Sequence, residues 1–257
     1  MANNGAMAPD HLQPSPRQPS PLQPSLLGED PATAEPAARE PTATVPTATV
    51  HTAGVIDAPA GPPDLAALER DCRECRRCGL AEGRRTVVVS RGDPAARLMV
   101  IGEGPGAQED ASGRPFVGRA GQLLDQMLAS VGLDSERDAY VCNVVKCRPP
   151  DNRRPTPQEI AACAPWLAAQ IAAVDPAVVL LAGATALEGV LGIKGGITRL
   201  RGRWHPWQGR WVMPVFHPSY LLRNPSREKG SPKWLTWQDL QEVRRRLEED
   251  RPPTPSL

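Results

Sequence analysis

The sequence lacks the features that mark several classes of protein. No stretch of its 257 residues approaches about 18 consecutive apolar residues, which excludes a transmembrane helix. No basic start followed by an apolar core is present, so no secretory signal is predicted. Without such a signal, the six cysteines predict metal or redox chemistry in the cytosol before disulfides.

Residues 1–63 also lack aromatic residues and cysteines. They hold 13 of the 30 prolines, and their two arginines stand against six carboxylates, a net charge of −4. A segment of this composition cannot bury enough apolar surface to offset its ordering entropy. We therefore predict a disordered Pro/Ala/Thr-rich leader over 1–63, one domain over 64–250 and a disordered tail over 251–257.

Apolar runs alternate with helical patterns along the predicted domain. Short apolar runs predict buried strands at residues 97–104, 140–145, 177–183 and 211–219. Apolar residues at helical spacing predict helices at 120–133, 184–191 and 234–249. This alternation favours an α/β fold with three αβα layers around a central, mainly parallel four-stranded sheet.

Two further helices are indicated by their first residues. Asp64 is a plausible N-cap before the pattern LAALERDC, and Thr156-Pro157-Gln158-Glu159 is a capping box with proline at the first helical position. Pro165 is predicted to interrupt the second of these helices just after Cys163, because proline lacks an N–H and clashes with the preceding turn.

Polar features follow three of the predicted strands. They are the turn Gly102-Glu103-Gly104-Pro105-Gly106, then Asn143, then His217. Since ligands bind outside the carboxyl ends of strands in an open parallel sheet, we expect these features to meet in one crevice.

The turn GEGPGA also matches the G-x-G-x-x-G/A pattern of dinucleotide-binding folds, which leaves a nucleotide-dependent oxidoreductase as an alternative. Pro105 would remove a backbone donor from such a loop, and the acidic residue expected about 20 positions on is missing. A glycine turn that lets a flat ring approach the backbone is the favoured interpretation.

The cysteines predict a metal site. Cys75 and Cys78 form a C-x2-C pair before the first predicted strand, and Cys147 and Cys163 follow the second. Four thiolates of this kind suit either zinc or an iron–sulfur cluster, and Cys72 could replace one member. The alternative is a set of unrelated buried thiols.

Three long motifs stand out in the sequence: EGPGAQEDASGRPFVGRAGQLLD, NVVKCRPPDNRRPTPQEIAAC and HPSYLLR. Together they resemble the family 4 uracil-DNA glycosylases, the iron–sulfur members of the uracil-DNA glycosylase superfamily, from about Cys75 to Glu248. The resemblance implies a [4Fe–4S] cluster held by Cys75, Cys78, Cys147 and Cys163. It leaves Cys72 and Cys142 as spares.

The resemblance also implies roles for three pocket residues. Phe116 would stack on an everted uracil, although a lone phenylalanine more often belongs to a core. Asn143 would read the base, because its amide can donate to O4 and accept from N3–H. His217 would stabilise the negative charge that develops on the departing base.

Carboxylates near the first turn are further candidates. Better-known relatives place an aspartate at the position of Gly104, so we predict that Glu103 positions water or orders the backbone, and that Gly104 contacts substrate. Glu109 is predicted to shape the pocket edge where a thymine methyl would have to fit.

The segment after His217 is predicted to contact DNA. Leu221, Leu222 and Arg223, with Tyr220 before them, would form an apolar wedge and a cation that fill the gap left by the base. Basic residues that could contact phosphates are Arg148, Arg153, Arg154, Arg199, Arg201, Arg203, Arg210, Arg223, Lys229 and Lys233. Arg244–Arg246 are left out because nearby glutamates offset them.

We thus predict a monomeric, monofunctional DNA glycosylase that hydrolyses the N-glycosidic bond of deoxyuridine in uracil-containing DNA and leaves an abasic site. A lyase is not expected, since Lys146 is the only lysine adjoining a site motif. The alternative is a non-catalytic, cluster-bearing DNA-binding or damage-sensing protein. No membrane partner is expected, and the sequence indicates no partner for the leader.

Overall fold

The computed structural model describes residues 64–249, so the predictions for the leader 1–63 and the tail 251–257 lie outside it. Within this range no helix is both long and apolar enough to cross a membrane. The first described residue, Asp64, caps the first helix as predicted, accepting a hydrogen bond from the Ala66 backbone N–H at 2.9 Å.

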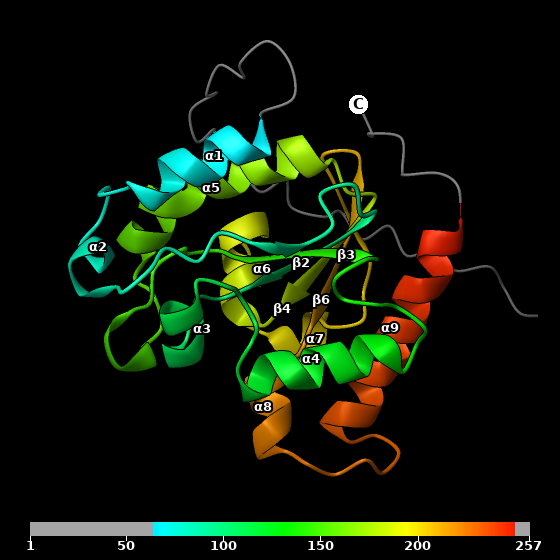
Figure 1. The fold of residues 1–257 in the computed structure, drawn as a ribbon. Helices are drawn as coiled ribbons and strands as arrows, with labels where there is room; N and C mark the ends of the chain where they lie inside the picture. Colours follow the sequence, from blue (N-terminus) through cyan, green and yellow to red (C-terminus); the bar gives the residue numbers. More distant parts are fainter. Residues whose placement is uncertain (1–63, 250–257) are drawn as a thin grey trace, which may run out of the picture. The chain divides into compact units, whose positions relative to one another are not determined.

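A six-stranded sheet with the order β1-β3-β2-β4-β6-β5 forms the middle layer (Figure 1). The four inner strands are parallel, which confirms the predicted sheet. The short edge strands are antiparallel and were not predicted, because two or three residues carry no periodic signal. The strands are β1 (Arg91–Gly92), β2 (Leu98–Gly102), β3 (Ala139–Asn143), β4 (Val178–Ala182), β5 (His205–Trp207) and β6 (Arg210–Val215).

Helices cover both faces of the sheet. In Figure 1, α1, α5 and α6 lie on one side and α4 and α9 on the other, which confirms the three layers. The helices are α1 (Leu65–Arg73), α2 (Leu80–Gly83), α3 (Ala107–Ser112), α4 (Arg119–Ala129), α5 (Pro157–Val174), α6 (Ala184–Leu191), α7 (Ile197–Leu200), α8 (Pro218–Arg223) and α9 (Pro232–Glu248), with a 3-10 turn at Pro150–Asn152.

Each inner strand supplies two cores, because successive side chains point to opposite faces of a strand. On β2, Met99 packs in a core that includes Leu167 of α5, whereas Leu98 packs in a core that includes Leu124 of α4 and Leu240 of α9. Every residue of β2, β3 and β4 is buried. This continuous burial explains why the strands read as unbroken apolar runs.

The predicted interruption of α5 at Pro165 is wrong. The capping box at Thr156 starts the helix as expected, but α5 continues through Pro165 to Val174. Proline removes only the hydrogen bond to the Ala161 carbonyl. Leu167 and Ile171, which follow it, are buried against the sheet, and this packing holds the second half of the helix in place.

The connections create a crevice at the carboxyl end of the sheet. The chain leaves β2 toward β3 on one side and leaves β4 toward β6 on the other, although β2 and β4 are neighbours. Such a reversal of direction separates the two following loops and opens space for a ligand.

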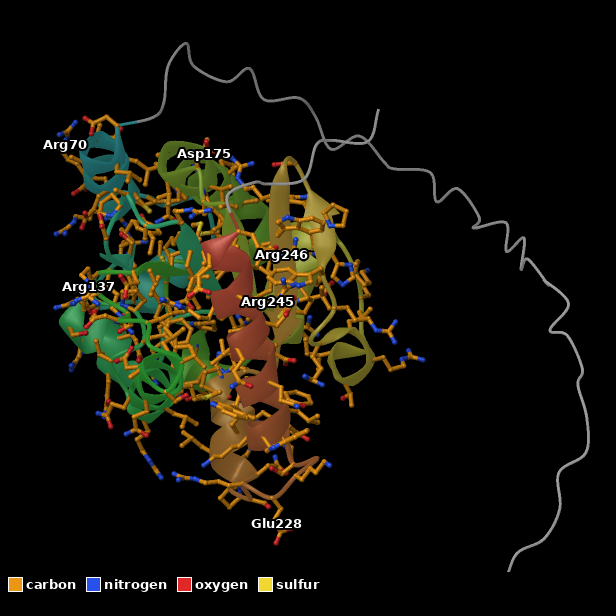
Figure 2. All side chains as sticks on the ribbon, turned by 90° about the vertical axis from the view of Figure 1, so that its right-hand side faces the viewer. Arg70, Arg137, Asp175, Glu228, Arg245 and Arg246 are labelled. Carbon is orange, nitrogen blue, oxygen red and sulfur yellow. The ribbon has the colours of Figure 1, made fainter. Side chains whose placement is uncertain are left out.

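The arginines near the end of α9 are held by contacts within the domain. Figure 2 labels Arg245 and Arg246 on this helix, where Arg245 pairs with Glu242 and Glu249. The Arg246 guanidinium lies 4.4 Å from the centre of the Trp211 ring. These contacts confirm that this basic run is engaged within the protein.

The packing predicts a large cost for truncating the centre of the sheet. Leu180 on β4 is fully buried in the core beneath α4 and α9. Leu180→Ala is expected to lower the free energy of unfolding by about 2–5 kcal/mol, as cavity-forming substitutions do. Urea unfolding measures this, and the half-buried Leu247→Ala at the end of α9 is the matched control. Equal losses in the two variants would contradict this account of the core.

Candidate active site

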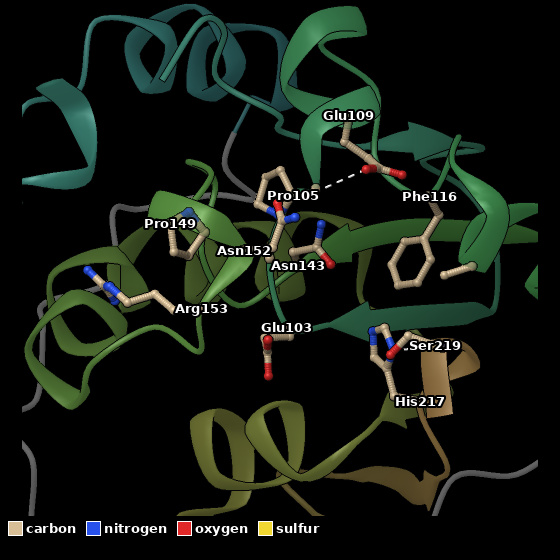
Figure 3. Close-up of a pocket in the computed structure, with 13 residues that line it drawn as sticks. Glu103, Pro105, Glu109, Phe116, Asn143, Pro149, Asn152, Arg153, His217 and Ser219 are labelled. Atoms are coloured by element: carbon tan, nitrogen blue, oxygen red, sulfur yellow. Dashed lines mark hydrogen bonds between the residues drawn. The ribbon is translucent and has the colours of Figure 1, made fainter. Parts of the chain in front are cut away.

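A pocket of about 220 Å³ opens at the carboxyl ends of β2, β3 and β6 (Figure 3). It confirms that the three polar strand ends converge. Its walls include all six predicted catalytic and substrate-binding residues, which are Glu103, Gly104, Glu109, Phe116, Asn143 and His217.

Phe116 holds an unusual backbone conformation. Its φ of 54° lies in the left-handed region, which costs a non-glycine residue on the order of 1–3 kcal/mol unless its surroundings impose it. The Glu109 carboxylate imposes part of it, because Oε1 accepts hydrogen bonds from the N–H groups of Val117 at 3.0 Å and Gly118 at 2.8 Å. The structure thus shows Glu109 holding the loop that carries Phe116.

A buried arginine holds the other side of Phe116. The side chain of Arg91 is 3% exposed, and its Nε donates to the Pro115 carbonyl at 2.9 Å. Its terminal nitrogens pair with Asp125 and Glu136. Gly121 completes the fit, since a Cβ there would lie 1.8 Å from the Phe116 carbonyl oxygen. The backbone that carries the Phe116 ring is therefore held by the protein itself.

Asn143 ends β3 directly beside Gly102 at the end of β2. A Cβ at Gly102 would lie 2.5 Å from Asn143 Oδ1 and 2.4 Å from Phe116 Cζ, so only glycine lets these two side chains share the space. The side chain of Asn143 is nearly fully buried, and within residues 64–249 no hydrogen bond occupies its amide. Its donor and acceptor remain available to a ligand.

His217 is the N-cap of α8, and its ring is oriented by the next turn. Nδ1 accepts a hydrogen bond from the Ser219 backbone N–H at 3.1 Å and lies 2.8 Å from Ser219 Oγ. Burial, aided by the charge of Arg223, lowers the pKa of His217 to about 4. The imidazole is therefore neutral at pH 7 with its proton on Nε2, a fixed donor. The ring centroids of His217 and Phe116 are 6.1 Å apart.

Glu103 lies in the crevice between β2 and β4. Thr185, in the first turn of α6, donates its hydroxyl to Oε2 of Glu103 at 2.5 Å, and in Figure 3 the carboxylate points away from Asn143 and Phe116. Its other oxygen has no hydrogen-bond partner among the described residues, so it can accept one from water or a ligand. Gly104, the next residue, is half-buried at the pocket wall.

The four predicted metal-binding cysteines line a second pocket. Cys75 and Cys78 come from the segment after α1, Cys147 follows β3, and Cys163 lies on α5. Cys72 also lines it, whereas Cys142 is buried on β3. In the described part of the chain no group of three or more His, Cys, Asp or Glu residues is arranged to hold a metal ion.

The sulfurs of this pocket accept hydrogen bonds from three sides. Arg84 Nη1 lies 3.3 Å from Cys147 Sγ, Trp166 Nε1 lies 3.2 Å from Cys75 Sγ, and the Lys146 backbone N–H donates to Cys163 Sγ at 3.3 Å. Burial raises the pKa of the Cys163 thiol to about 11. Bound metal would be needed to replace the thiol proton at neutral pH.

The structure contradicts one residue of the predicted wedge. Leu221 is fully buried on the inner face of α8, so its assignment to the wedge is wrong. Helical spacing turns this residue toward the core. Leu222 is half-buried and Arg223 is exposed, and their role in DNA contact stays a prediction. Tyr220 is 38% exposed and offers an aromatic surface at the same place.

Several predicted phosphate contacts are engaged elsewhere. Arg201 pairs with the buried Asp239, and Arg210, Arg153 and Arg154 pair with carboxylates of the domain. Arg153 and Arg154 are nevertheless exposed, and Arg199, Arg203, Arg223 and Lys229 are exposed and form no ion pair among residues 64–249.

Sequence reasoning missed the residues that support the site. Ser219 orients His217, and its place two residues after a histidine within HPS was a usable signal. Arg91 and Thr185 carry no signal of this kind, because their partners lie 24 and 82 positions away.

The sequence of this domain is also similar to those of known proteins. A family model described as the uracil DNA glycosylase superfamily matches residues 89–241. The chain belongs to this superfamily. The matched range contains both the pocket around Phe116 and the last two cysteines of the second pocket, so the superfamily accounts for most of the described domain.

Curated relatives share a more specific name. The type-4 uracil-DNA glycosylase of Thermotoga maritima is 52% identical over 158 residues, 61% of this chain and 82% of the relative. The type-4 uracil-DNA glycosylases of Sulfurisphaera tokodaii and Archaeoglobus fulgidus are each 38% identical, over 64% and 63% of this chain and 79% and 84% of those proteins.

The depressed pKa of His217 predicts a pH-dependent stability. Between about pH 6.5 and pH 4 the unfolded chain binds a proton that native His217 does not, so stability present above pH 6.5 is lost as the pH falls, by up to about 3 kcal/mol. His217→Gln removes this titration. Urea unfolding at about pH 7 and pH 4.5 is expected to show a smaller loss in the variant. Parallel losses in both proteins would contradict the assignment of a neutral ring.

Proposed function

We propose that this protein hydrolyses the N-glycosidic bond of deoxyuridine in DNA, the first step of base excision repair, and leaves an abasic site. The observation that carries the proposal is the convergence of Phe116, Asn143 and His217 from three distant segments on one pocket. Membership of the uracil DNA glycosylase superfamily and the names of the relatives support it.

The pocket is built for one flat base. A base inside a duplex cannot be reached, so the nucleotide must be everted, at a cost of a few kcal/mol. The preset ring of Phe116 offers a stacking surface, and the open amide of Asn143 can donate to O4 and accept from N3–H of uracil. Cytosine presents the reverse pattern, so discrimination against it requires that the Asn143 amide be kept from flipping.

The leaving group is an anion, and His217 faces it as a neutral donor. As the glycosidic bond breaks, negative charge develops on the oxygens of uracil while the sugar gains positive character. An Nε2–H fixed by the contact of Nδ1 with Ser219 stabilises the first of these charges without any reorientation.

Hydrolysis also requires a water on the sugar. Glu103 has one oxygen bound to Thr185 and one available, so it can orient water and offset the charge of the sugar. Lys146 does not act as a Schiff-base nucleophile, because it is 1% exposed and its Nζ donates to the Asn143 carbonyl at 2.6 Å. This arrangement supports a monofunctional glycosylase.

We propose that Cys75, Cys78, Cys147 and Cys163 hold a [4Fe–4S] cluster. The four cysteines line one pocket, and the relatives' shared name, type-4 uracil-DNA glycosylase, is that of the iron–sulfur family. The hydrogen bonds from Arg84 and Trp166 suit cluster thiolates. When bound, the cluster cross-links the segment after α1 to α5, which is a structural role.

The remaining assignments concern the setting of the reaction. We propose that Tyr220, Leu222 and Arg223 contact the DNA around the everted nucleotide, and that the protein acts as a monomer. All six cysteines are free, which fits the reducing cytosol as its place of action.

The activity is tested by release of free uracil from an oligonucleotide with a single uracil. Asn143→Ala and His217→Gln are each expected to lower the single-turnover rate by about 10²–10³ at unchanged fold, since each removes a preorganised polar contact. Gln126→Ala, an exposed amide on α4, is the control. DNA binding by both variants with no uracil release by wild type would instead favour the non-catalytic DNA-binding protein.

The cluster is tested separately. Purified protein is expected to be brown with about four irons per chain. Cys147→Ser is expected to lower the yield of folded protein and its iron content, because one ligand is lost, while Cys142→Ser retains both. A colourless wild-type protein with one zinc per chain would overturn the cluster and leave the glycosylase proposal standing.

A further inference from the structure

We propose that Lys146 is a positioning residue that couples the cysteine pocket to the base-reading amide of Asn143. The expected effect on base recognition rests on the proposed function, whereas the coupling itself rests on the contacts of Lys146 within the protein. Lys146 lies between the two pockets along the chain, three residues after Asn143 and directly before Cys147.

The first observation is the burial of this cation. Lys146 is among the largest fully buried side chains, at 1% exposure. None of the ion pairs formed by residues 64–249 includes it. A buried charge is costly unless it is paired and hydrogen-bonded, so a counter-charge of another kind is required.

The sulfur atoms around Lys146 can supply that counter-charge. The Lys146 backbone N–H donates to Cys163 Sγ at 3.3 Å, which places this residue against a sulfur of the cysteine pocket. Lys146 also lines the cysteine pocket itself. Thiolates bound to a metal group would therefore place negative charge beside the Lys146 ammonium.

The other end of the contact reaches the active site. Lys146 Nζ donates to the backbone carbonyl of Asn143 at 2.6 Å, where β3 ends and the chain turns away from the sheet. The Asn143 amide has no hydrogen-bond partner in the described range, so its position depends on the backbone that carries it. A cation held by the cysteine pocket thus fixes the residue that reads the base.

The cysteine pocket would therefore affect base recognition in addition to its structural role. Loss of its negative charge would leave the Lys146 cation uncompensated, and loss of Lys146 would free the end of β3. Either change is expected to disturb base recognition before it disturbs DNA binding, because the exposed cations near α8 are untouched.

The test uses the full-length, iron-loaded protein with Lys146→Met, which keeps the length of the side chain and removes its charge and donor. The uracil-release rate is expected to fall by between about tenfold and a hundredfold, as misplaced groups do, with affinity for abasic-site DNA within about twofold of wild type. Hydrogen exchange at residues 139–147 is expected to be faster. Lys194→Met, at an exposed lysine, is the matched control and is expected to leave all three unchanged.

The outcomes separate this inference from the proposed function. Wild-type exchange and wild-type rate in Lys146→Met would overturn it. Exchange that quickens in a protein whose wild type releases no uracil would support the coupling and reject the glycosylase. If Lys146→Met does not accumulate as folded protein, Lys146→Arg keeps the charge and displaces the donor: a reduced rate with full iron content supports the inference, and an unchanged rate overturns it.

Discussion

The parallel pairing of β2 with β3 is the constraint on which the site depends. It sets Gly102 opposite Asn143, and the missing Cβ of Gly102 is what allows the Asn143 amide and the Phe116 ring to occupy adjoining space. Because both strands are buried on both faces, a one-residue slip would exchange the side chains packed against α5 with those packed against α4 and disrupt both cores. The geometry of the pocket is therefore guaranteed by the core of the sheet.

Charged groups, of which Arg91 and Lys146 are buried and Glu109 is half-buried, hold the loops that the sheet does not reach. Arg91 and Glu109 bind the backbone on either side of Phe116, and Lys146 binds the carbonyl of Asn143. Arg91 and Lys146 lie among buried groups that are mainly apolar, where an unpaired charge would be costly. Their hydrogen bonds to backbone groups make the pocket rigid, which suits recognition of a small planar ligand.

Local signals predicted the elements well, and they failed where distant packing decided the outcome. The capping box at Thr156 and the helix over 184–191 formed as expected, since their determinants lie within a few residues. Pro165 did not end its helix, because burial of Leu167 against the sheet outweighed one lost hydrogen bond. Leu221 turned into the core, since the direction of a short helix depends on what packs beneath it.

By itself the sequence determined the alternation of strands and helices, the polar residues at the strand ends and the set of cysteines, since all of these are encoded in short spacings. Only the tertiary structure decided which nitrogen of His217 carries the proton, how Phe116 is held, and that a buried lysine joins the two pockets. Those features depend on contacts between side chains and backbone groups that come together only when the chain folds.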